Sequence, residues 1–279
     1  MSDIGKQTKK IGSEFGGEWT KVKLTILEKY LSFYVDALKN LKVKLTYIDA
    51  FAGSGKTSLP TGDIEGSASI AMKYDFDNYY FIEYDQNRLV DLKKYIAENF
   101  PAKVGKVTYL HGDCNKELIT VFNQLNKYQR GVMFLDPYAM ELRWEVLQAA
   151  QKTEILDIWY LFPVMAVNRN LKNDGEISAG TKQKISAILP DGWYEALYYE
   201  NPQTNMWNFT DMRKVNITNF IGFIQEKLKS VFPHVATKPV ELKNSKKSLQ
   251  FLLCFMISNP SVKAGALAKK VVDDIVGRI

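Results

Sequence analysis

A short apolar run that ends in an acid and passes directly into a glycine-rich turn constrains this chain more than any other feature. Residues 44–57 read KLTYIDAFAGSGKT, and the run before Asp49 has the β-branched and aromatic content of a buried strand. Gly53 and Gly55 allow the backbone after that strand to turn tightly and to approach a ligand closely. The stretch therefore predicts a strand that leads into a nucleotide- or phosphate-binding loop.

Two classes of ligand fit this loop. Read as D-x-x-x-G-x-G, it is the first loop of a doubly wound fold that holds an adenosine-bearing cofactor at the carboxyl end of a strand. Read as A-x-x-x-x-G-K-T over residues 50–57, it lacks only the first glycine of a P-loop. In that second reading Lys56 and Thr57 would bind a phosphate and Mg²⁺.

Apolar runs and helical patterns alternate along most of the chain. Further strands are expected at residues 78–83, 106–110, 131–135 and 155–162, with helices between them, and a closing pair of strands at 237–242 and 249–258. The alternation predicts a parallel sheet with helices on both faces, and the short polar loop before residue 249 predicts an antiparallel hairpin. The expected fold class is α/β, with a seven-stranded, mostly parallel sheet that ends in this hairpin.

The domain organisation follows from where the pattern starts and where it breaks. Residues 1–17 are polar and without periodicity, so we expect a mobile N-terminal arm, and residues 18–279 should form one domain that begins with an amphipathic helix. Between about residues 163 and 214 the alternation is lost in a basic and aromatic, helical insertion. Its aromatic residues either clamp a substrate, such as a nucleobase, or form a small core of their own.

Composition narrows the class of protein. The chain has 279 residues, is 46% hydrophobic, and contains no uninterrupted apolar stretch of about 18 residues, so we expect a cytoplasmic protein without a membrane partner. A net charge of +6 is compatible with a nucleic-acid partner, either DNA or RNA. The two cysteines are far apart and only two histidines are present, which argues against a zinc site or a disulfide scaffold.

Acids at the ends of the predicted strands favour the cofactor reading of the loop. Glu83 ends the second strand about thirty residues after the first glycine of the loop, where a ribose hydroxyl pair is read, and a P-loop protein needs no acid there. Asp136 after the apolar run GVMFL suits either reading, since it can also hold Mg²⁺. With the missing glycine and the closing hairpin, the balance favours a Rossmann-like, S-adenosylmethionine-dependent methyltransferase.

Several motifs together resemble one family. The runs YIDAFAGSG, FIEYD, GDCN and FLDPYAMELRW, followed by LDIWYLFP and FMISNP, are similar to the three-Cys-motif partner proteins. These are bacterial and phage-associated proteins that are usually classed with methyltransferases. The resemblance covers nearly the whole chain from Trp19. It implies a class I methyltransferase-like domain over residues 18–279, S-adenosylmethionine as cofactor, and a partner protein that carries the three-Cys motif.

Likeness to methyltransferases in general implies roles for individual residues. The cofactor-binding residues would be Asp49, Phe51, Gly53, Gly55, Glu83, Asp113 and Cys114. Glu83 would hold the ribose hydroxyls, and Asp113 would accept a hydrogen bond from the exocyclic amine of the adenine. The alternative for Asp113 is to cap the helix that follows it.

Asp136, Pro137 and Tyr138 resemble the D-P-P-Y loop of methyltransferases that modify exocyclic amines of adenine or cytosine. In that loop the acid and a proline carbonyl accept from the target amine while the aromatic ring stacks on the base, so positioning does much of the catalytic work. The present sequence has one proline where the motif has two. Second-rank substrate-binding candidates are Arg143, Trp144 and Arg169, with burial as the alternative for Trp144.

Three functions follow from these observations. The first is S-adenosylmethionine-dependent methylation of a nucleic-acid base through the Asp136–Pro137–Tyr138 loop. The second is a P-loop-like NTPase that uses Lys56, Thr57 and Asp136 with Mg²⁺. The third is a non-catalytic protein that keeps the cofactor fold as a scaffold for a partner.

Overall fold

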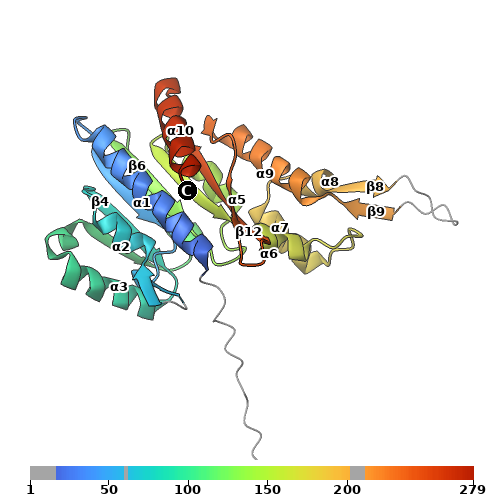
Figure 1. Ribbon diagram of the computed structural model, residues 1–279, viewed down its shortest axis with the longest axis horizontal. Helices are drawn as coiled ribbons and strands as arrows, with labels where there is room; N and C mark the ends of the chain where they lie inside the picture. The colour runs from blue at the N-terminus through green and yellow to red at the C-terminus, as the bar shows by residue number, and fades with distance from the viewer. Residues whose placement is uncertain (1–16, 60–61, 202–210) are drawn as a thin grey trace, which may run out of the picture.

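The structure is a computed structural model that describes residues 17–59, 62–201 and 211–279. One central sheet has helices on both faces, and a smaller group of elements extends from one end of it (Figure 1). The arm expected over residues 1–17 lies, apart from Gly17, outside the described residues. None of the described helices is both long enough and apolar enough to cross a membrane.

The sheet has the expected mixture of parallel and antiparallel strands, in the order β10-β12-β7-β6-β1-β4-β5, with β11 also paired to β12. Its parallel strands are β1 (Lys44–Asp49), β4 (Asn78–Glu83), β5 (Val107–His111), β6 (Gln129–Leu135) and β7 (Leu156–Phe162). Its antiparallel strands are β10 (His234–Val235), β11 (Val240–Lys243) and β12 (Leu249–Ile257). The α/β class and the closing hairpin are confirmed, and β10 adds a short eighth strand where residues 234–235 pair with the end of β12.

Each face of the sheet carries its own hydrophobic cluster because side chains alternate along a strand. Within β1, Tyr47 belongs to one cluster and Ile48 to the other. The Tyr47 face is covered by α1 (Glu18–Leu38), α2 (Ser67–Met72), α3 (Gln86–Asn99) and α10 (Val262–Gly277). The Ile48 face is covered by α4 (Cys114–Phe122), α5 (Trp144–Gln151) and α9 (Ile217–Val231). A 3-10 turn, η1 (Pro101–Lys106), precedes β5.

Helix α1 packs across the sheet face with its apolar stripe inward. The Tyr30 ring is fully buried, and its centroid lies 5.4 Å from that of Trp159 on β7 and 5.0 Å from that of Phe255 on β12. These edge-on aromatic contacts add to the burial of apolar area that holds the helix down. The beginning of α1 lies at the same end of the sheet as the loops after β1 and β6, because Lys23 of α1 pairs with Asp136 after β6.

The connection after the glycine loop contains regular structure that the sequence did not predict. It forms a hairpin of β2 (Lys56–Leu59) and β3 (Gly62–Glu65), in which Lys56 pairs with Glu65. The Gly66 N–H donates to the Gly55 carbonyl at 2.8 Å and closes the base of the hairpin. Two strands of four residues leave too short an alternation to be detected in the sequence.

The insertion contains α6 (Val164–Asn170), α7 (Ala179–Ile188), α8 (Trp193–Leu197), β8 (Tyr198–Asn201) and β9 (Asp211–Lys214), and β8 and β9 extend away from the sheet (Figure 1). Its aromatic residues mostly pack inward. Trp193 and Tyr198 are buried, the Trp193 indole N–H donates to Ser186 Oγ at 2.9 Å, and the Tyr194 hydroxyl donates to the Gly175 carbonyl at 3.1 Å. For these residues the small core, not the clamp, is the structural role, while the clamp candidates Trp207 and Phe209 lie outside the described residues.

Candidate functional site

The acids predicted at the strand ends meet at the carboxyl edge of the sheet. Strand β1 pairs with β4 on one side and with β6 on the other. From β4 the sheet continues outward to β5, and from β6 it continues in the opposite direction to β7. Such a reversal of strand order opens a crevice for ligands at the carboxyl ends of parallel strands. Asp49 ends β1, Glu83 ends β4, and Asp136 directly follows β6, so all three lie at this edge of the sheet.

The glycine loop is held to β4 by its own backbone and by Glu83. The Ala52 N–H donates to the Ile82 carbonyl at 3.0 Å, and the Gly53 N–H donates to Glu83 Oε2 at 2.8 Å. The other carboxylate oxygen of Glu83 accepts from the Asp85 N–H at 2.9 Å. A carboxylate has about four acceptor positions, so Glu83 keeps capacity for a ligand while it fixes the loop.

Gly53 and Gly55 serve different purposes. Both have left-handed backbone angles, with φ of +61° and +83°. A β-carbon at Gly55 would lie 3.0 Å from Leu92 Cδ1 and 3.1 Å from Ser69 Oγ, whereas one at Gly53 would meet nothing within 4 Å. Gly55 is therefore required for packing, and Gly53 borders open space beside the loop.

Asp49 supports the glycine loop from the protein interior. Its carboxylate accepts from the Phe51 N–H at 3.2 Å and from the Tyr47 hydroxyl at 3.4 Å, and the residue is fully buried. Burial raises the pKa of Asp49 to about 7. Through the Phe51 amide, Asp49 fixes the first turn of the glycine loop.

Asp113 and Cys114 lie at the start of α4. Asp113 Oδ1 accepts from the Asn115 N–H at 3.0 Å, which is the helix-capping role that the sequence left as the alternative. Cys114 is buried, and burial raises the pKa of its thiol to about 12. The capping bond fixes Asp113 at the carboxyl edge, next to β4 and its acid.

The loop after β6 carries an ion pair. Lys23 of α1 donates from its ammonium to Asp136 Oδ2, and the Lys23 and Asp136 side chains are 8% and 23% exposed. Pro137 is buried, and Tyr138 is 74% exposed with its backbone N–H donating to Glu141 Oε2 at 3.0 Å. The loop therefore presents one partly accessible carboxylate and one exposed aromatic ring.

Asn115 fastens this loop to α4. Its amide nitrogen donates to the Glu141 carbonyl at 2.9 Å, and its amide oxygen accepts from the Arg143 N–H at 2.8 Å. The backbone of Glu141 and that of Arg143 are thus both hydrogen-bonded to the Asn115 side chain. The position of the loop depends on a residue that lies 28 positions before Arg143.

Of the three substrate-binding candidates, two are accessible. Arg143 is exposed at the start of α5, and Arg169 is exposed in the last turn of α6, which follows the carboxyl end of β7. Trp144 is 7% exposed and belongs to the hydrophobic cluster of the Ile48 face. The expectation that Trp144 contacts a substrate is therefore corrected, because its indole packs in the core.

With the geometry in place, the strand order identifies the architecture. The fold is that of the Rossmann-like methyltransferases. Five parallel strands with the reversal beside β1, followed by an antiparallel hairpin at one edge, are the features expected of it.

Comparison with known proteins gives matches to solved structures alone. No protein-family model matches the chain, and no curated protein matches it. The similarity to the three-Cys-motif partner proteins therefore remains a resemblance of motifs.

Solved structures with a similar fold include methyltransferases. A candidate O-methyltransferase from Klebsiella pneumoniae is 10% identical with a TM-score of 0.46, over 86% of this chain and 88% of that chain. The methyltransferase domain of bacterial CtHen1 is 11% identical with a TM-score of 0.40, over 83% and 98%. The N-terminal domain of EvdMO1, solved with SAH and D-fucose, is 9% identical with a TM-score of 0.41, over 83% and 82%. At these values the fold assignment rests on the strand order.

The methyltransferase fold also removes the structural basis of the P-loop reading. In a P-loop the Gly-Lys-Thr sequence opens a helix whose N-terminus faces the phosphates. Here Lys56 and Thr57 begin β2, and the next helix starts only at Ser67. The Lys56 ammonium lies 5.5 Å from the Tyr95 ring centroid, and Asp136, the expected Mg²⁺ ligand, is paired with Lys23.

Three residues at the carboxyl edge of the methyltransferase fold were not predicted. Lys23 and Asn115 contact the loop after β6, and Tyr84, which is 78% exposed, directly follows Glu83. A lysine within the apolar stripe of a predicted helix is a signal that would have indicated Lys23. An aromatic residue directly after a strand-ending acid would have indicated Tyr84.

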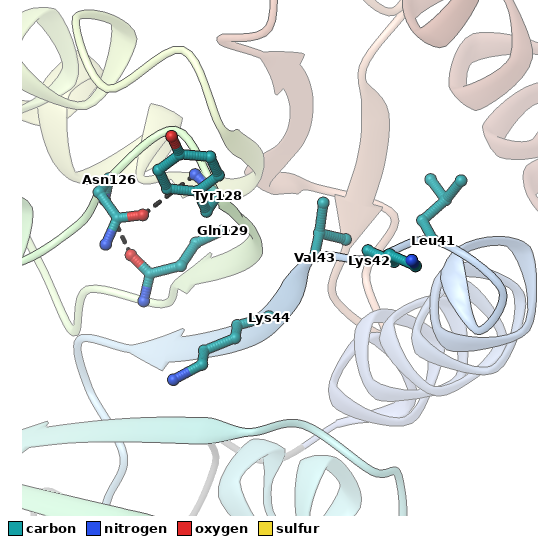
Figure 2. A pocket seen from close by; sticks show the side chains of 7 residues that line it. All are labelled: Leu41, Lys42, Val43, Lys44, Asn126, Tyr128 and Gln129. Atoms are coloured by element: carbon teal, nitrogen blue, oxygen red, sulfur yellow. Dashed lines mark hydrogen bonds between the residues drawn. The ribbon is translucent and has the colours of Figure 1, made fainter.

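A separate hollow of about 480 Å³ lies at the opposite end of the sheet (Figure 2). It is lined by Leu41, Lys42, Val43, Lys44, Asn126, Tyr128 and Gln129. Lys44 and Gln129 are paired at the amino ends of β1 and β6. Because ligands of parallel sheets bind at the carboxyl ends, this hollow is not the cofactor site of the fold.

Proposed function

We propose that this protein is an S-adenosylmethionine-dependent methyltransferase that modifies an exocyclic amine of a nucleic-acid base. The observation that carries the proposal is the loop after β6, where the accessible carboxylate of Asp136 and the exposed ring of Tyr138 lie beside the crevice at β1. A hydrogen-bond acceptor and an aromatic ring on one loop can together bind the amine and the plane of an aromatic base. The reversal of strand order beside β1 supports a cofactor site next to this loop.

The residues around the crevice fit the proposed cofactor. Gly53 leaves space beside the loop, and Glu83 retains acceptor capacity for ribose hydroxyls. Asp113, between β5 and α4, is suited to accept from the adenine amine, and Tyr84 offers an exposed ring next to Glu83. When bound there, S-adenosylmethionine supplies an electrophilic methyl group.

The chain would orient the acceptor and take up its proton. Asp136 and the Pro137 carbonyl accept from the two hydrogens of the amine, which turns the nitrogen lone pair out of conjugation with the base. Tyr138 stacks on the base and fixes its plane. The proton that the amine loses on methylation passes to Asp136 and from there to water.

The exposure and the charge of basic side chains support the proposed nucleic-acid partner. A base in a duplex must be flipped out of the helix or presented single-stranded to reach Asp136. Arg143, Arg169 and Lys172 are exposed in the segments that follow β6 and β7, where they suit a phosphate backbone. We further propose a domain over residues 18–279 with its insertion at about 163–214, a cytoplasmic location, and a protein partner with a three-Cys motif.

Ligand-dependent melting tests the cofactor first. Purified protein is heated with S-adenosylmethionine, S-adenosylhomocysteine or Mg·ATP, because a ligand that binds only the folded state raises the melting temperature. We expect a rise with the first two and none with Mg·ATP. A rise with Mg·ATP alone would refute the proposal and favour the NTPase.

Transfer of a labelled methyl group to single- and double-stranded DNA and RNA then tests the acceptor. The Asp136→Asn variant should keep its melting shift with S-adenosylhomocysteine and lose at least about a hundredfold in transfer, the usual loss for a positioned acid or base. Full cofactor binding without transfer to any of these acceptors would instead favour the non-catalytic scaffold. Salt-dependent retention of the same oligonucleotides provides an independent measure of binding.

A further inference from the structure

We propose that Lys23 is a specificity-determining residue that makes the site select a neutral aromatic amine and reject a protonated alkyl amine. The inference rests on the proposed function, because it concerns the acceptor that Asp136 would receive. It assigns a role to a helix that lies outside the crevice-forming loops. Its basis is the ion pair between α1 and the loop after β6.

The Lys23 ammonium is fixed in place by two groups. It donates to Asp136 Oδ2, and it lies 5.1 Å from the ring centroid of Trp19, one helical turn earlier on α1. Trp19 in turn packs against Phe251 of β12 with ring centroids 4.9 Å apart. A desolvated ammonium between a carboxylate and an aromatic face is held both by its ion pair and by the cation–π contact.

The fold dictates which side of the loop meets Lys23. Side chains alternate along β6, and Phe134 belongs to the hydrophobic cluster that α1 covers. Asp136 lies two positions further along and faces the same way, toward α1. Lys23 lies within the apolar stripe of α1, between Trp19 and the buried Ile26. It therefore reaches this carboxylate without crossing solvent.

The pairing leaves one carboxylate oxygen for a substrate. Lys23 contacts Oδ2, while Oδ1 of Asp136 has no hydrogen-bond partner among the residues that the structure describes. The Asp136 side chain keeps 23% of its surface exposed. One charge-compensated oxygen therefore remains to accept a hydrogen bond from an incoming amine.

Charge compensation decides which amines can react. An alkyl amine such as a lysine side chain is protonated at neutral pH, so it has no lone pair to attack a methyl group. An uncompensated carboxylate would attract this cation and accept its proton, which frees the lone pair for attack, whereas the Lys23 ammonium opposes the approach of the cation. The exocyclic amine of a nucleobase is neutral and loses nothing by this repulsion.

Other charges near the loop do not replace Lys23. Asp49, the acid that acts electrostatically on Asp136, is fully buried beneath the glycine loop. Glu141 and Arg143 are exposed to solvent and opposite in sign, so water and salt screen their effects. Within the described part of the chain, Lys23 makes the one ion pair of Asp136.

Three variants test the inference. Lys23→Met removes the charge and keeps the length of the side chain, Lys23→Arg keeps the charge, and Lys21→Met removes an exposed charge from the same helix as a matched control. Each is incubated with labelled S-adenosylmethionine and either an adenine-containing single-stranded oligonucleotide or a lysine-rich peptide. Melting with S-adenosylhomocysteine verifies that each variant is folded and binds cofactor.

The ratio of the two acceptors is the decisive measurement. We expect Lys23→Met to shift the oligonucleotide-to-peptide ratio by roughly tenfold or more toward the peptide, since one unit charge at close range changes binding by at least that factor. Lys23→Arg and Lys21→Met should keep the wild-type ratio. An unchanged ratio in Lys23→Met overturns the inference, and so does faster methylation of the oligonucleotide, because the pair would then be an inhibitory contact.

Binding separates this inference from the proposed function. If the wild-type protein methylates neither acceptor, the proposed function fails, and the affinities of the two probes for the complex with S-adenosylhomocysteine decide the role of Lys23. Lys23→Met should bind the lysine-rich peptide roughly tenfold more tightly than wild type, measured by fluorescence anisotropy at low salt. Equal peptide affinity in the two proteins overturns the inference on this measure as well.

Discussion

The buried carboxyl group of Asp49 gives this protein a pH-dependent stability whose sign is opposite to that of a salt-bridged acid. In the folded protein burial raises the pKa of Asp49 from 3.8 to about 7. Between these two values the unfolded chain ionises while the folded chain stays protonated. The contribution of Asp49 to stability is therefore fully present below about pH 4 and is lost as the pH rises toward 7.

The magnitude follows from the pKa values. Moving the pKa from 3.8 to about 7, at about 1.4 kcal/mol for each pKa unit, costs the ionised folded state about 4 kcal/mol. The variant Asp49→Asn keeps an acceptor for the Phe51 N–H and removes the titration. We expect its free energy of unfolding, relative to wild type, to increase by up to about 4 kcal/mol between pH 4 and pH 8.

Urea unfolding of both proteins at a series of pH values measures this difference. Asp91→Asn, which replaces an exposed acid on α3, serves as the matched control and should show no comparable trend. A difference between Asp49→Asn and wild type that stays constant from pH 4 to pH 8 would refute the reasoning. A difference that grows as the pH falls would mean that Asp49 is ionised in the folded state and stabilised by its neighbours.

Two further substitutions probe the loops of the crevice. Gly55→Ala should lower the free energy of unfolding by about 2–4 kcal/mol, since it combines a left-handed backbone with crowding against Leu92. Gly53→Ala should lower it by only about 1–2 kcal/mol, and a larger loss for Gly53→Ala than for Gly55→Ala in urea unfolding would contradict this. Asn115→Ala should release the loop after β6, lower methyl transfer by about tenfold or more, and leave the melting shift with S-adenosylhomocysteine unchanged. Asn123→Ala, which replaces an exposed residue at the opposite end of the same helix, is its control, and full transfer activity in Asn115→Ala would show that the loop needs no such anchor.

The parts of the fold that the sequence predicted are those encoded by local patterns. Each parallel strand is a short apolar run, and helices with their own periodicity separate the runs, so the class and the closing hairpin follow from the chain in order. The acids after β1, β4 and β6 were located for the same reason, because each directly ends its strand. The hairpin of β2 and β3 was missed because four residues per strand give too little alternation.

The roles of aromatic residues were harder to predict because composition does not say which way a side chain points. Trp193 and Tyr198 sit in a basic, aromatic segment that suits either a clamp or a core, and the tertiary structure buries both. Trp144 follows the loop after β6 closely in sequence, yet its helix turns it toward the sheet. Tyr138, five residues before Arg143, lies on the loop after β6 with 74% of its surface exposed.

The sequence by itself therefore determined the alternation of strands and helices along most of the chain, the glycine loop and the acids at the strand ends, since each is a property of a few consecutive residues. Only the tertiary structure decided which side chains meet Asp136. Lys23 lies 113 positions earlier, and Asn115 reaches the same loop from another helix. These contacts exist because α1 packs across one face of the sheet and α4 across the other, and no local pattern couples residues that only the packing of helices on a sheet brings together.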